Sequence, residues 1–379
     1  MNRKLVVSAA MVLVIALLSV FLLQNWFSSN QAPPRQFYVG IMFAYGTEVS
    51  EVEALVDKVK DYTNLFVLGS VDLSTSEESL NNACDYIASS GLNFIIQFRG
   101  LDTYNYSITD WIVEAHQKYG KPFLGIYRYD EPGGRQLDGD SATKLLNQSI
   151  TDPNATYQQV ADAYVGNLSY FPRHYLQFTP QMFTADYALY WYDYKANYSA
   201  VFCEFVGNES RERHIGLCRG AANAFNKDWG SIITWKYNQE PYLQSGAELY
   251  DDLALAYSAG SKYAVVFSYP QTGPYGTLTE DHFDALRHFW NTLSINPSRF
   301  GENKAEAAYV VPVDYGFGFR SATDTIWGLF PADDLSAKIY EDIETLTAQY
   351  GAKLDILYDE DEVILNNYSN VYFWNQTIG

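Results

Sequence analysis

The sequence predicts an α/β protein, namely a (β/α)8 TIM barrel with a small C-terminal α/β unit and an N-terminal transmembrane helix. The barrel is predicted because short apolar runs rich in β-branched and aromatic residues alternate with helical patterns over about 260 residues. The C-terminal unit is predicted because further strand patterns and one long helical pattern follow. The transmembrane helix is predicted because a long uncharged apolar run lies near the N-terminus.

The predicted membrane segment occupies residues 1–27. Two basic residues, Arg3 and Lys4, precede an uncharged, mostly apolar run over residues 5–23, which is long enough to cross a bilayer as a helix. Their charge favours a cytoplasmic N-terminus and places the rest of the chain outside the cell. A cleaved signal peptide has a similar charge pattern, but this apolar run is longer than usual and no Ala-x-Ala site closes it. We therefore expect an uncleaved signal anchor, followed by a polar linker over residues 28–36.

An excess of N-glycosylation sequons favours the same extracellular location. Roughly three Asn-x-Ser/Thr motifs would be expected by chance, and the sequence contains eight. A polar surface rich in Asn and Ser is the alternative explanation, but together with the predicted anchor the excess favours a glycoprotein. The sequon asparagines are Asn105, Asn147, Asn154, Asn167, Asn197, Asn208, Asn367 and Asn375.

The composition of the chain indicates which classes of molecule it can bind. The formal net charge is −20 and there is no basic stripe, which argues against nucleic-acid binding. Aromatic residues make up 16% of the chain and include 32 Tyr, whose rings suit contact with sugars, although half-buried packing in a large barrel is the preferred explanation from composition alone. The three cysteines form no metal motif. Cys203 and Cys218 could form a disulfide outside the cell, but three buried thiols are the preferred interpretation.

Eight apolar segments are the predicted barrel strands. Most are bounded by glycine, proline or polar residues, as strands usually are. The fifth strand lies within the aromatic stretch 182–194, where the pattern does not define its edges. The strands cover residues 37–45, 65–70, 93–100, 123–129, part of 182–194, 200–206, 231–237 and 263–269.

Helical patterns separate these strands. The first places Val52, Leu55, Val56 and Val59 on one face, and the second follows N-cap candidates at residues 74–76. The helices cover residues 49–62, 76–90, 108–119, 157–171, 211–225, 245–259 and 280–293. A doubly wound open sheet is the alternative fold, but if it bound a nucleotide it would need a Gly-rich phosphate turn after an early strand, and none is present. A barrel over residues 37–298 is therefore expected.

Residues 299–379 are predicted to form a small accessory α/β domain that packs on the barrel, since it is too small for confident independent folding. Its strands are expected at 307–312, 353–358 and 370–374, and its helix at 335–350. The loop 314–334 is unusually long, which indicates a functional segment or a cover. Its residues Arg320, Asp324 and Trp327 are candidates to reach over the barrel mouth.

Active sites of such barrels lie at the C-terminal ends of the strands. These ends carry carboxylates, cations and aromatic residues but no His cluster, so the usual ligands of a hydrolytic metal are missing, and neither a metal site nor a cofactor is expected. No nucleophile elbow is present for a Ser-His-Asp arrangement. Two carboxylates in an aromatic cleft remain, which is what glycoside hydrolysis requires. The predicted substrate-binding residues are Tyr45, Arg99, Arg128, Asp130, Trp191, Asp193, Trp235, Tyr237 and Tyr269.

The segment FLGIYRYDEPGG resembles the end of the fourth strand in clan-A glycoside hydrolases, where Asn-Glu-Pro carries the acid/base residue. The resemblance implies that Glu131 is the general acid/base. Asp130 stands where that clan has Asn, so the usual contact with the sugar 2-hydroxyl is altered. A barrel followed by a small α/β domain is also similar to the microbial β-galactosidases that have a flavodoxin-like second domain.

The second carboxylate has two candidates. In AVFCEFV, alternation places Ala200, Phe202 and Glu204 on one face of a strand, and a charge inside a barrel needs a partner or a task. Glu204 could instead neutralise a cation such as Lys236. Glu240 follows the seventh strand, where the clan places its nucleophile. Some α-glycosidase barrels resemble the pairing of acids from strands four and six, so Glu131 with Glu204 is preferred.

The expected function is therefore an extracytoplasmic, membrane-anchored glycoside hydrolase that cleaves polysaccharide or glycoprotein glycans. The alternative is a non-catalytic barrel that binds glycans or belongs to a cell-surface layer, for which the sequons and the altered Asp-Glu-Pro motif are the arguments.

Overall fold

The computed structural model describes residues 35–99, 104–140, 142–147, 152, 154–360 and 362–378. The predicted membrane anchor, residues 1–27, lies outside the described residues. Within the described ranges, no helix combines the length and the apolar character needed to cross a membrane.

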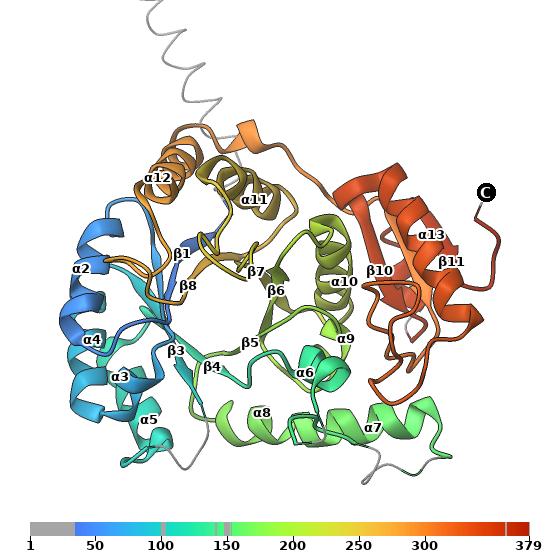
Figure 1. The fold of residues 1–379 in the computed structure, drawn as a ribbon, viewed down its shortest axis with the longest axis horizontal. Helices are drawn as coiled ribbons and strands as arrows, with labels where there is room; N and C mark the ends of the chain where they lie inside the picture. The colour runs from blue at the N-terminus through green and yellow to red at the C-terminus, as the bar shows by residue number, and fades with distance from the viewer. Residues whose placement is uncertain are drawn as a thin grey trace, which may run out of the picture. The chain divides into compact units, whose positions relative to one another are not determined.

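Parallel strands close into a barrel, which confirms the predicted (β/α)8 fold (Figure 1). The strands are paired in chain order, and β1 (Tyr38–Phe43) closes the barrel by pairing with both β2 (Leu65–Leu68) and β8 (Tyr263–Ser268). The remaining barrel strands are β3 (Asn93–Phe98), β4 (Phe123–Arg128), β5 (Met182–Asp186), β6 (Ala200–Phe205) and β7 (Asp228–Ile233).

Successive side chains of each barrel strand point alternately into the barrel interior and toward the surrounding helices. One apolar cluster occupies the interior and includes Tyr127, Phe183 and Phe202, whose rings lie together. The intervening residues, such as Cys203, join the larger cluster beneath the helices. Successive side chains of a strand point to opposite faces, so Glu204 shares the interior face with Phe202. The predicted orientation of Glu204 is therefore confirmed.

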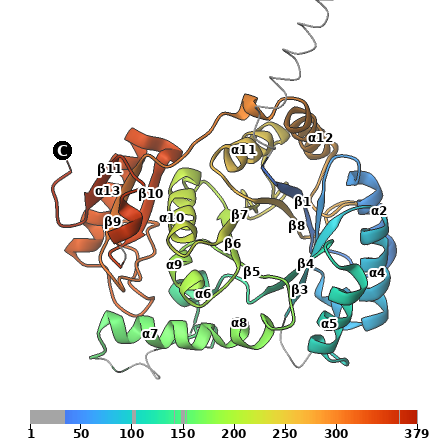
Figure 2. The ribbon, with the colours of Figure 1, turned by 180° about the vertical axis from the view of Figure 1, so that it is seen from behind.

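Helices surround the barrel in the described part of the chain (Figure 2). N-cap side chains accept the backbone N–H of the third helical residue at Ser76, Ser107, Thr156, Ser210 and Ser245. The long helices are α2 (Val49–Val59), α4 (Glu77–Ser89), α5 (Ile108–Tyr119), α7 (Tyr157–Leu168), α10 (Arg211–Ala224), α11 (Gly246–Ser258) and α12 (Glu280–Ile295). The short ones are α3 (Val71–Thr75), α6 (Pro132–Asp138), α8 (Tyr170–Tyr175) and α9 (Tyr190–Lys195).

The aromatic stretch 182–194 is not a single strand. β5 ends at Asp186, and the residues from Tyr190 onward form α9, in which Tyr190, Trp191, Tyr192, Asp193 and Tyr194 are all buried. The pattern was ambiguous because a short helix buried on all sides is apolar at every position, like a buried strand.

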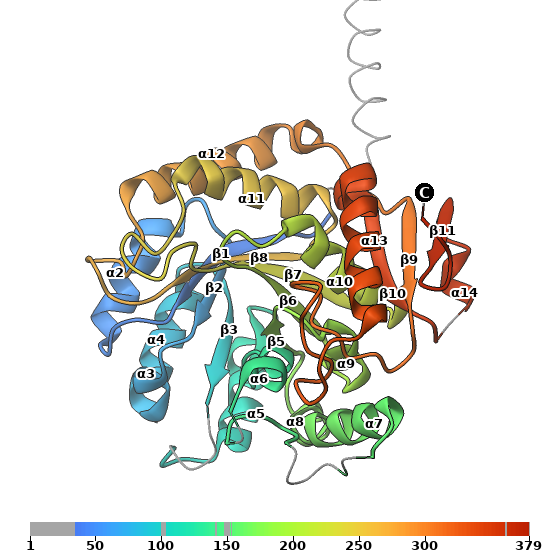
Figure 3. The ribbon, with the colours of Figure 1, turned by 45° about the vertical axis from the view of Figure 1, so that its right-hand side comes forward.

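The C-terminal residues form a three-stranded parallel sheet in the order β10-β9-β11. Its strands are β9 (Ala307–Val311), β10 (Leu354–Tyr358) and β11 (Asn370–Phe373). They are accompanied by α13 (Asp334–Tyr350), α14 (Glu362–Leu365) and the 3-10 helices η2 (Pro297–Phe300) and η3 (Gly351–Lys353). Figure 3 shows this sheet beside the barrel helix α10.

The contact between α10 and β10 is very close. A Cβ atom added to Gly216 or Gly220 would stand 2.7 Å from the carbonyl oxygen of Leu354 and 2.6 Å from that of Ile356. Only glycine permits this approach. Arg219 lies in the same contact, 4% exposed, and its Nε donates to the fully buried Asp355 at 2.7 Å.

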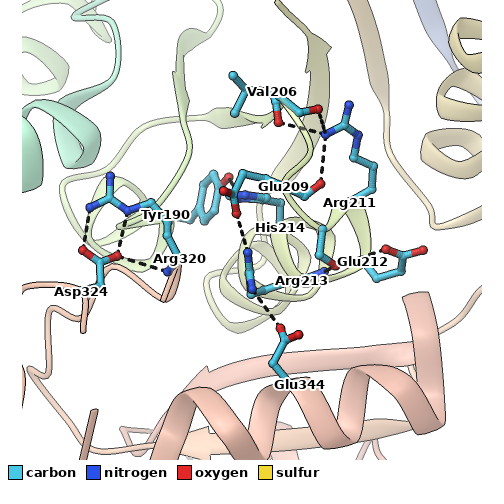
Figure 4. Close-up of polar contacts among 12 residues, drawn as sticks. Tyr190, Val206, Glu209, Arg211, Glu212, Arg213, His214, Arg320, Asp324 and Glu344 are labelled. Carbon is cyan, nitrogen blue, oxygen red and sulfur yellow. Dashed lines mark hydrogen bonds and ion pairs between the residues drawn. The ribbon is translucent and has the colours of Figure 1, made fainter. Parts of the chain in front are cut away.

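Arg213 provides a second link to the C-terminal sheet. Its guanidinium bridges Glu209, which precedes α10, and Glu344 of α13 (Figure 4). Behind it, the hydroxyl of Tyr190 lies 2.9 Å from Nδ1 of the buried His214. Burial lowers the pKa of His214 to about 3, so this imidazole is neutral. The three cysteines are buried free thiols, and Cys203 and Cys218 are not bridged.

Candidate active site

A cavity of about 770 Å³ opens at the C-terminal end of the barrel strands. The structure brings together at this cavity both preferred acids and several predicted binding residues. Those that line it are Tyr45, Arg99, Asp130, Glu131, Glu204, Trp235 and Tyr269.

Glu131 and Glu204 are the central pair. Glu204 lies on β6 and is 5% exposed, while Glu131 follows β4 and is half-buried. The two carboxyl groups lie close enough for the charge of Glu131 to act strongly on Glu204. Burial, and then the charges of Asp130 and Asp186, raise the pKa of Glu131 to about 7. Burial and the neighbouring Glu131 raise the pKa of Glu204 well above its ordinary value.

The backbone after β4 is held in an unusual conformation. Glu131 has φ 50°, in the left-handed region, which costs roughly 1 kcal/mol or more for a residue with a side chain. Its N–H donates to the carbonyl oxygen of Ala185 at 3.0 Å, and Pro132 then starts α6. This anchoring to β5 directs the Glu131 side chain into the cavity.

Asp186, at the end of β5, clamps the start of α6. Its carboxylate accepts the N–H groups of Gly133 at 2.7 Å and Gly134 at 2.9 Å, and also that of Tyr187 at 2.8 Å. A Cβ at Gly133 would stand 2.4 Å from Asp186 Oδ2, so the closeness of this contact requires glycine. Asp186 is thus a functional candidate that the sequence reasoning missed.

Asp193 lies behind Asp186. Both side chains are fully buried, and the charge of Asp186 acts on Asp193. Neither carboxyl oxygen of Asp193 has a hydrogen-bond partner among the described residues. Burial and the charge of Asp186 raise the pKa of Asp193 well above its ordinary value, so Asp193 keeps its proton.

Two residues that were predicted to bind substrate therefore lie away from the cavity. Asp193 and Trp191 lie on α9, outside the barrel, and neither lines the cavity. Trp191 instead packs against Phe225 and Tyr358. The prediction was wrong because the strand ends before these residues.

Arg128 also points away from the cavity. It is 3% exposed, and its guanidinium lies 5.1 Å from the ring of Phe171 and 5.5 Å from that of Tyr175. Nη1 donates to the carbonyl oxygen of Arg99. As the last residue of β4, Arg128 has the opposite orientation to Tyr127, which belongs to the interior.

Tyr237 and Glu240 are exposed and do not line the cavity. β7 ends at Ile233, four residues earlier than expected, and the chain then continues as a loop. Glu240 therefore does not take part in the carboxyl pair. Glu204 forms no ion pair with a cation among the described residues, so the alternative of a neutralised charge is not supported either.

Asp130 adjoins the pair on the cavity wall. The buried Tyr127 donates its hydroxyl to Asp130 Oδ1 and accepts the N–H of Ala185 at 3.1 Å. Arg135 Nε donates to the Asp130 carbonyl oxygen at 2.8 Å, not to its carboxylate. One carboxylate oxygen of Asp130 is thereby fixed, and the other has no partner among the hydrogen bonds of the described residues.

Aromatic residues form the opposite wall. The rings of Trp235 and Tyr269 stack at 6.1 Å with an interplanar angle of 16°, and Trp235 Nε1 donates to the Tyr269 carbonyl oxygen. Tyr269 is 45% exposed. Phe267 continues this wall into the cavity. Such faces suit the apolar side of a sugar ring.

The long C-terminal loop lies behind α6. Gln136 of α6 donates to the carbonyl oxygen of the fully buried Trp327 at 2.8 Å. Arg320 pairs with Asp138 of α6 and with Asp324, the latter also seen in Figure 4. None of the three loop residues lines the cavity, so the expectation that they reach over the barrel mouth was wrong. The loop instead supports the helix that follows Glu131.

The sequence reasoning also missed polar residues on the wall formed by the first three strands. Glu48, Glu51, Asp72 and Gln97 line the cavity. Gln97 alternates with apolar residues on β3, a signal that could have identified it as an interior polar residue. The acids lie in the loops and helix starts after β1 and β2, where exposed carboxylates are common.

Comparison with known proteins supports the fold. No protein-family model matches the chain, and no curated protein matches its sequence. The α-L-fucosidase isoenzyme 2 from Paenibacillus thiaminolyticus is similar with a TM-score of 0.52 and 10% identity, over 89% of this chain and 59% of the fucosidase chain. The chain therefore spans less than two thirds of that protein.

Two mannanases match less well. The Bacillus subtilis mannanase BCman has a TM-score of 0.45 and 10% identity, over 68% of this chain and 86% of its own. The endo-1,4-beta-mannanase from Eisenia fetida has a TM-score of 0.41 and 10% identity, over 68% and 92%. At such identities similarity speaks for the fold alone: this chain has the TIM-barrel fold found in solved glycoside hydrolases.

Proposed function

We propose that this protein hydrolyses O-glycosidic bonds, with Glu131 as general acid/base and Glu204 as the opposing carboxylate. The observation that carries the proposal is the close pair of acids, the buried Glu204 and the half-buried Glu131, at an open cavity with an aromatic wall. Glycoside hydrolysis needs a proton donor and a second carboxylate beside one bond.

The raised pKa values of the two acids suit glycoside hydrolysis. A carboxyl pair that shares one proton supplies the acid and the carboxylate together, and its titration belongs to the pair. Glu131 is assigned the proton transfer because it is the less buried of the two and stands on the loop after β4. Its pKa of about 7 keeps a proton available near neutral pH.

The spacing favours retention of anomeric configuration. Inverting enzymes hold their carboxyls roughly 6.5–9.5 Å apart to admit a water molecule, whereas retaining enzymes hold them at about 5–5.5 Å. The charge of Glu131 raises the pKa of Glu204, which indicates that the two carboxyls are close together and favours the shorter separation. Glu204 would then act as nucleophile and form a covalent glycosyl ester, which water attacks with Glu131 as base.

The location is proposed to be extracytoplasmic, with residues 1–27 as the anchor and the barrel outside the cell. Seven of the sequon asparagines are exposed, and Asn147 is half-buried, so all are open to modification. Enzymatic deglycosylation of the protein from its native membrane fraction should reduce its mass. Protease added to intact cells should remove the barrel.

The catalytic assignment is tested with Glu131→Gln and Glu204→Gln. Each should reduce release of reducing sugar from a glycan panel by about 100- to 10,000-fold and leave the melting temperature nearly unchanged. Glu240→Gln is the matched control, since this exposed acid lies outside the cavity, and should retain full activity. Full activity in Glu131→Gln would refute the assignment. Glycan binding without any hydrolysis by the unmodified chain would identify a glycan-binding barrel instead.

A further inference from the structure

We infer that the cavity accepts a glycan of amino sugars whose amines are free and protonated. The inference rests on the proposed glycosidase function and specifies its substrate class. It follows from the charge of the cavity walls, from one buried hydroxyl and from the placement of the aromatic wall.

The cavity is lined by carboxyl groups from several strand ends. One guanidinium, that of Arg99, is the only cation among the described lining residues. None of the lining acids forms an ion pair with a cation in the described ranges of the chain. These acids are Glu48, Glu51, Asp72, Asp130, Glu131 and Glu204.

Glu51 is held in its ionised form by hydrogen bonds. Glu51 accepts the backbone N–H groups of Thr47 and Glu48 at 2.9 and 3.1 Å and the side-chain amide of Gln271 at 3.0 Å. These bonds lower its pKa against the effect of burial, so it is ionised. Glu48 and Asp72 are exposed at the rim. The cavity therefore presents a field that attracts cations.

A second observation concerns Tyr45, which lines the same cavity. Its side chain is 2% exposed, and its hydroxyl has no hydrogen-bond partner among the described residues. A buried hydroxyl without a partner costs free energy, and a polar ligand group relieves that cost. It stands on the β1 side of the cavity, beside the rim acids.

Other sugar classes fit these walls less well. A uronic acid or sulfated sugar would meet several carboxylates and only one guanidinium. A neutral sugar would cover ionised carboxylates without supplying a countercharge, which carries a desolvation cost. A protonated amine gives charge-assisted hydrogen bonds to carboxylates while the apolar ring face rests on Trp235 and Tyr269. Asp130 adjoins Glu131, so an amine on the carbon next to the reacting one lies within its reach.

The test is calorimetric titration of the full-length Glu131→Gln variant with three tetrasaccharides, at a pH where the amines are protonated. The probes are the glucosamine tetramer, its fully N-acetylated form and cellotetraose. The glucosamine tetramer should bind about tenfold tighter than either neutral tetramer, and about 0.5 M salt should largely remove the difference. Equal or tighter binding of a neutral tetramer would overturn the inference.

Two double variants that remove the same charge test whether the cavity acids cause the preference for the amine. Glu48→Gln with Asp72→Asn, added to Glu131→Gln, should reduce the preference for the amine about three- to tenfold. Glu114→Gln with Asp251→Asn removes the same charge from exposed sites outside the cavity and should leave the preference unchanged. Equal effects of both pairs would attribute the preference to overall charge and contradict the inference.

Hydrolysis by the unmodified chain separates this inference from the proposed function. Cleavage of neutral oligosaccharides but not of the glucosamine tetramer refutes the amine preference and leaves the glycosidase standing. Tight binding of the glucosamine tetramer with no cleavage supports the amine site and refutes the glycosidase.

Discussion

The buried acid pair behind the cavity has a measurable effect on stability. Asp193 keeps its proton in the folded state because it is fully buried against Asp186, whereas an unfolded aspartic acid loses its proton near pH 4. Its contribution is therefore fully present below the unfolded pKa and is lost as pH rises toward the folded pKa. Above about pH 5 the folded chain holds one proton more at this site, and the free energy of unfolding falls by about 1.4 kcal/mol per pH unit.

Asp193→Asn removes this dependence. The asparagine side chain has nearly the same size but carries no titrating proton. Relative to the unmodified chain, the variant should gain about 1.4 kcal/mol in free energy of unfolding between about pH 5 and about pH 6. Urea unfolding followed by tryptophan fluorescence at both pH values measures this difference, and the other buried acids cancel because both proteins contain them.

The exposed Asp251 provides the control, because Asp251→Asn should change stability equally at both pH values. A constant difference between Asp193→Asn and the unmodified chain across the same interval would show that Asp193 is ionised in the folded state. The assignment of a retained proton to Asp193 would then be wrong.

Three further predictions concern the clamp, the junction and the aromatic wall. Gly133→Ala places a methyl group 2.4 Å from Asp186 Oδ2 and should lower the free energy of unfolding by about 1–3 kcal/mol, measured with urea. Arg219→Met leaves the buried Asp355 without its cation and should cost about 3–5 kcal/mol in the same assay; a loss below about 1 kcal/mol would contradict the buried pairing. Trp235→Ala should weaken glycan binding about three- to tenfold in calorimetry with little change in melting temperature.

The barrel could be predicted because its pattern is local. Most strands are largely apolar and most long helices are apolar on one face, so a change of period marks most junctions; the junction between β5 and α9 is an exception. The position of Glu131 followed from the end of β4, and that of Glu204 from alternation with Phe202. These features depend on neighbours in sequence.

The features that were missed depend on distant partners. Asp186 is recognisable only through the N–H groups of Gly133 and Gly134, more than fifty residues earlier in the chain. Trp191 and Asp193 are directed outward because α9 is packed against elements from the C-terminal sheet, a contact that no local pattern encodes. Sequence spacing alone could not distinguish this burial from a cavity wall.

Helix α10 packs both on the barrel and on the C-terminal sheet, which limits the truncations that the chain can tolerate. Its glycine-lined face is shaped to receive the backbone of β10, so a chain ending near residue 298 would expose this face to water and leave the buried Arg219 without Asp355. The same truncation would remove the loop beneath α6 and free the segment that carries Glu131. The C-terminal sheet therefore forms part of the outer layer of the barrel. Residues in it that lie far from the cavity would affect the position of Glu131.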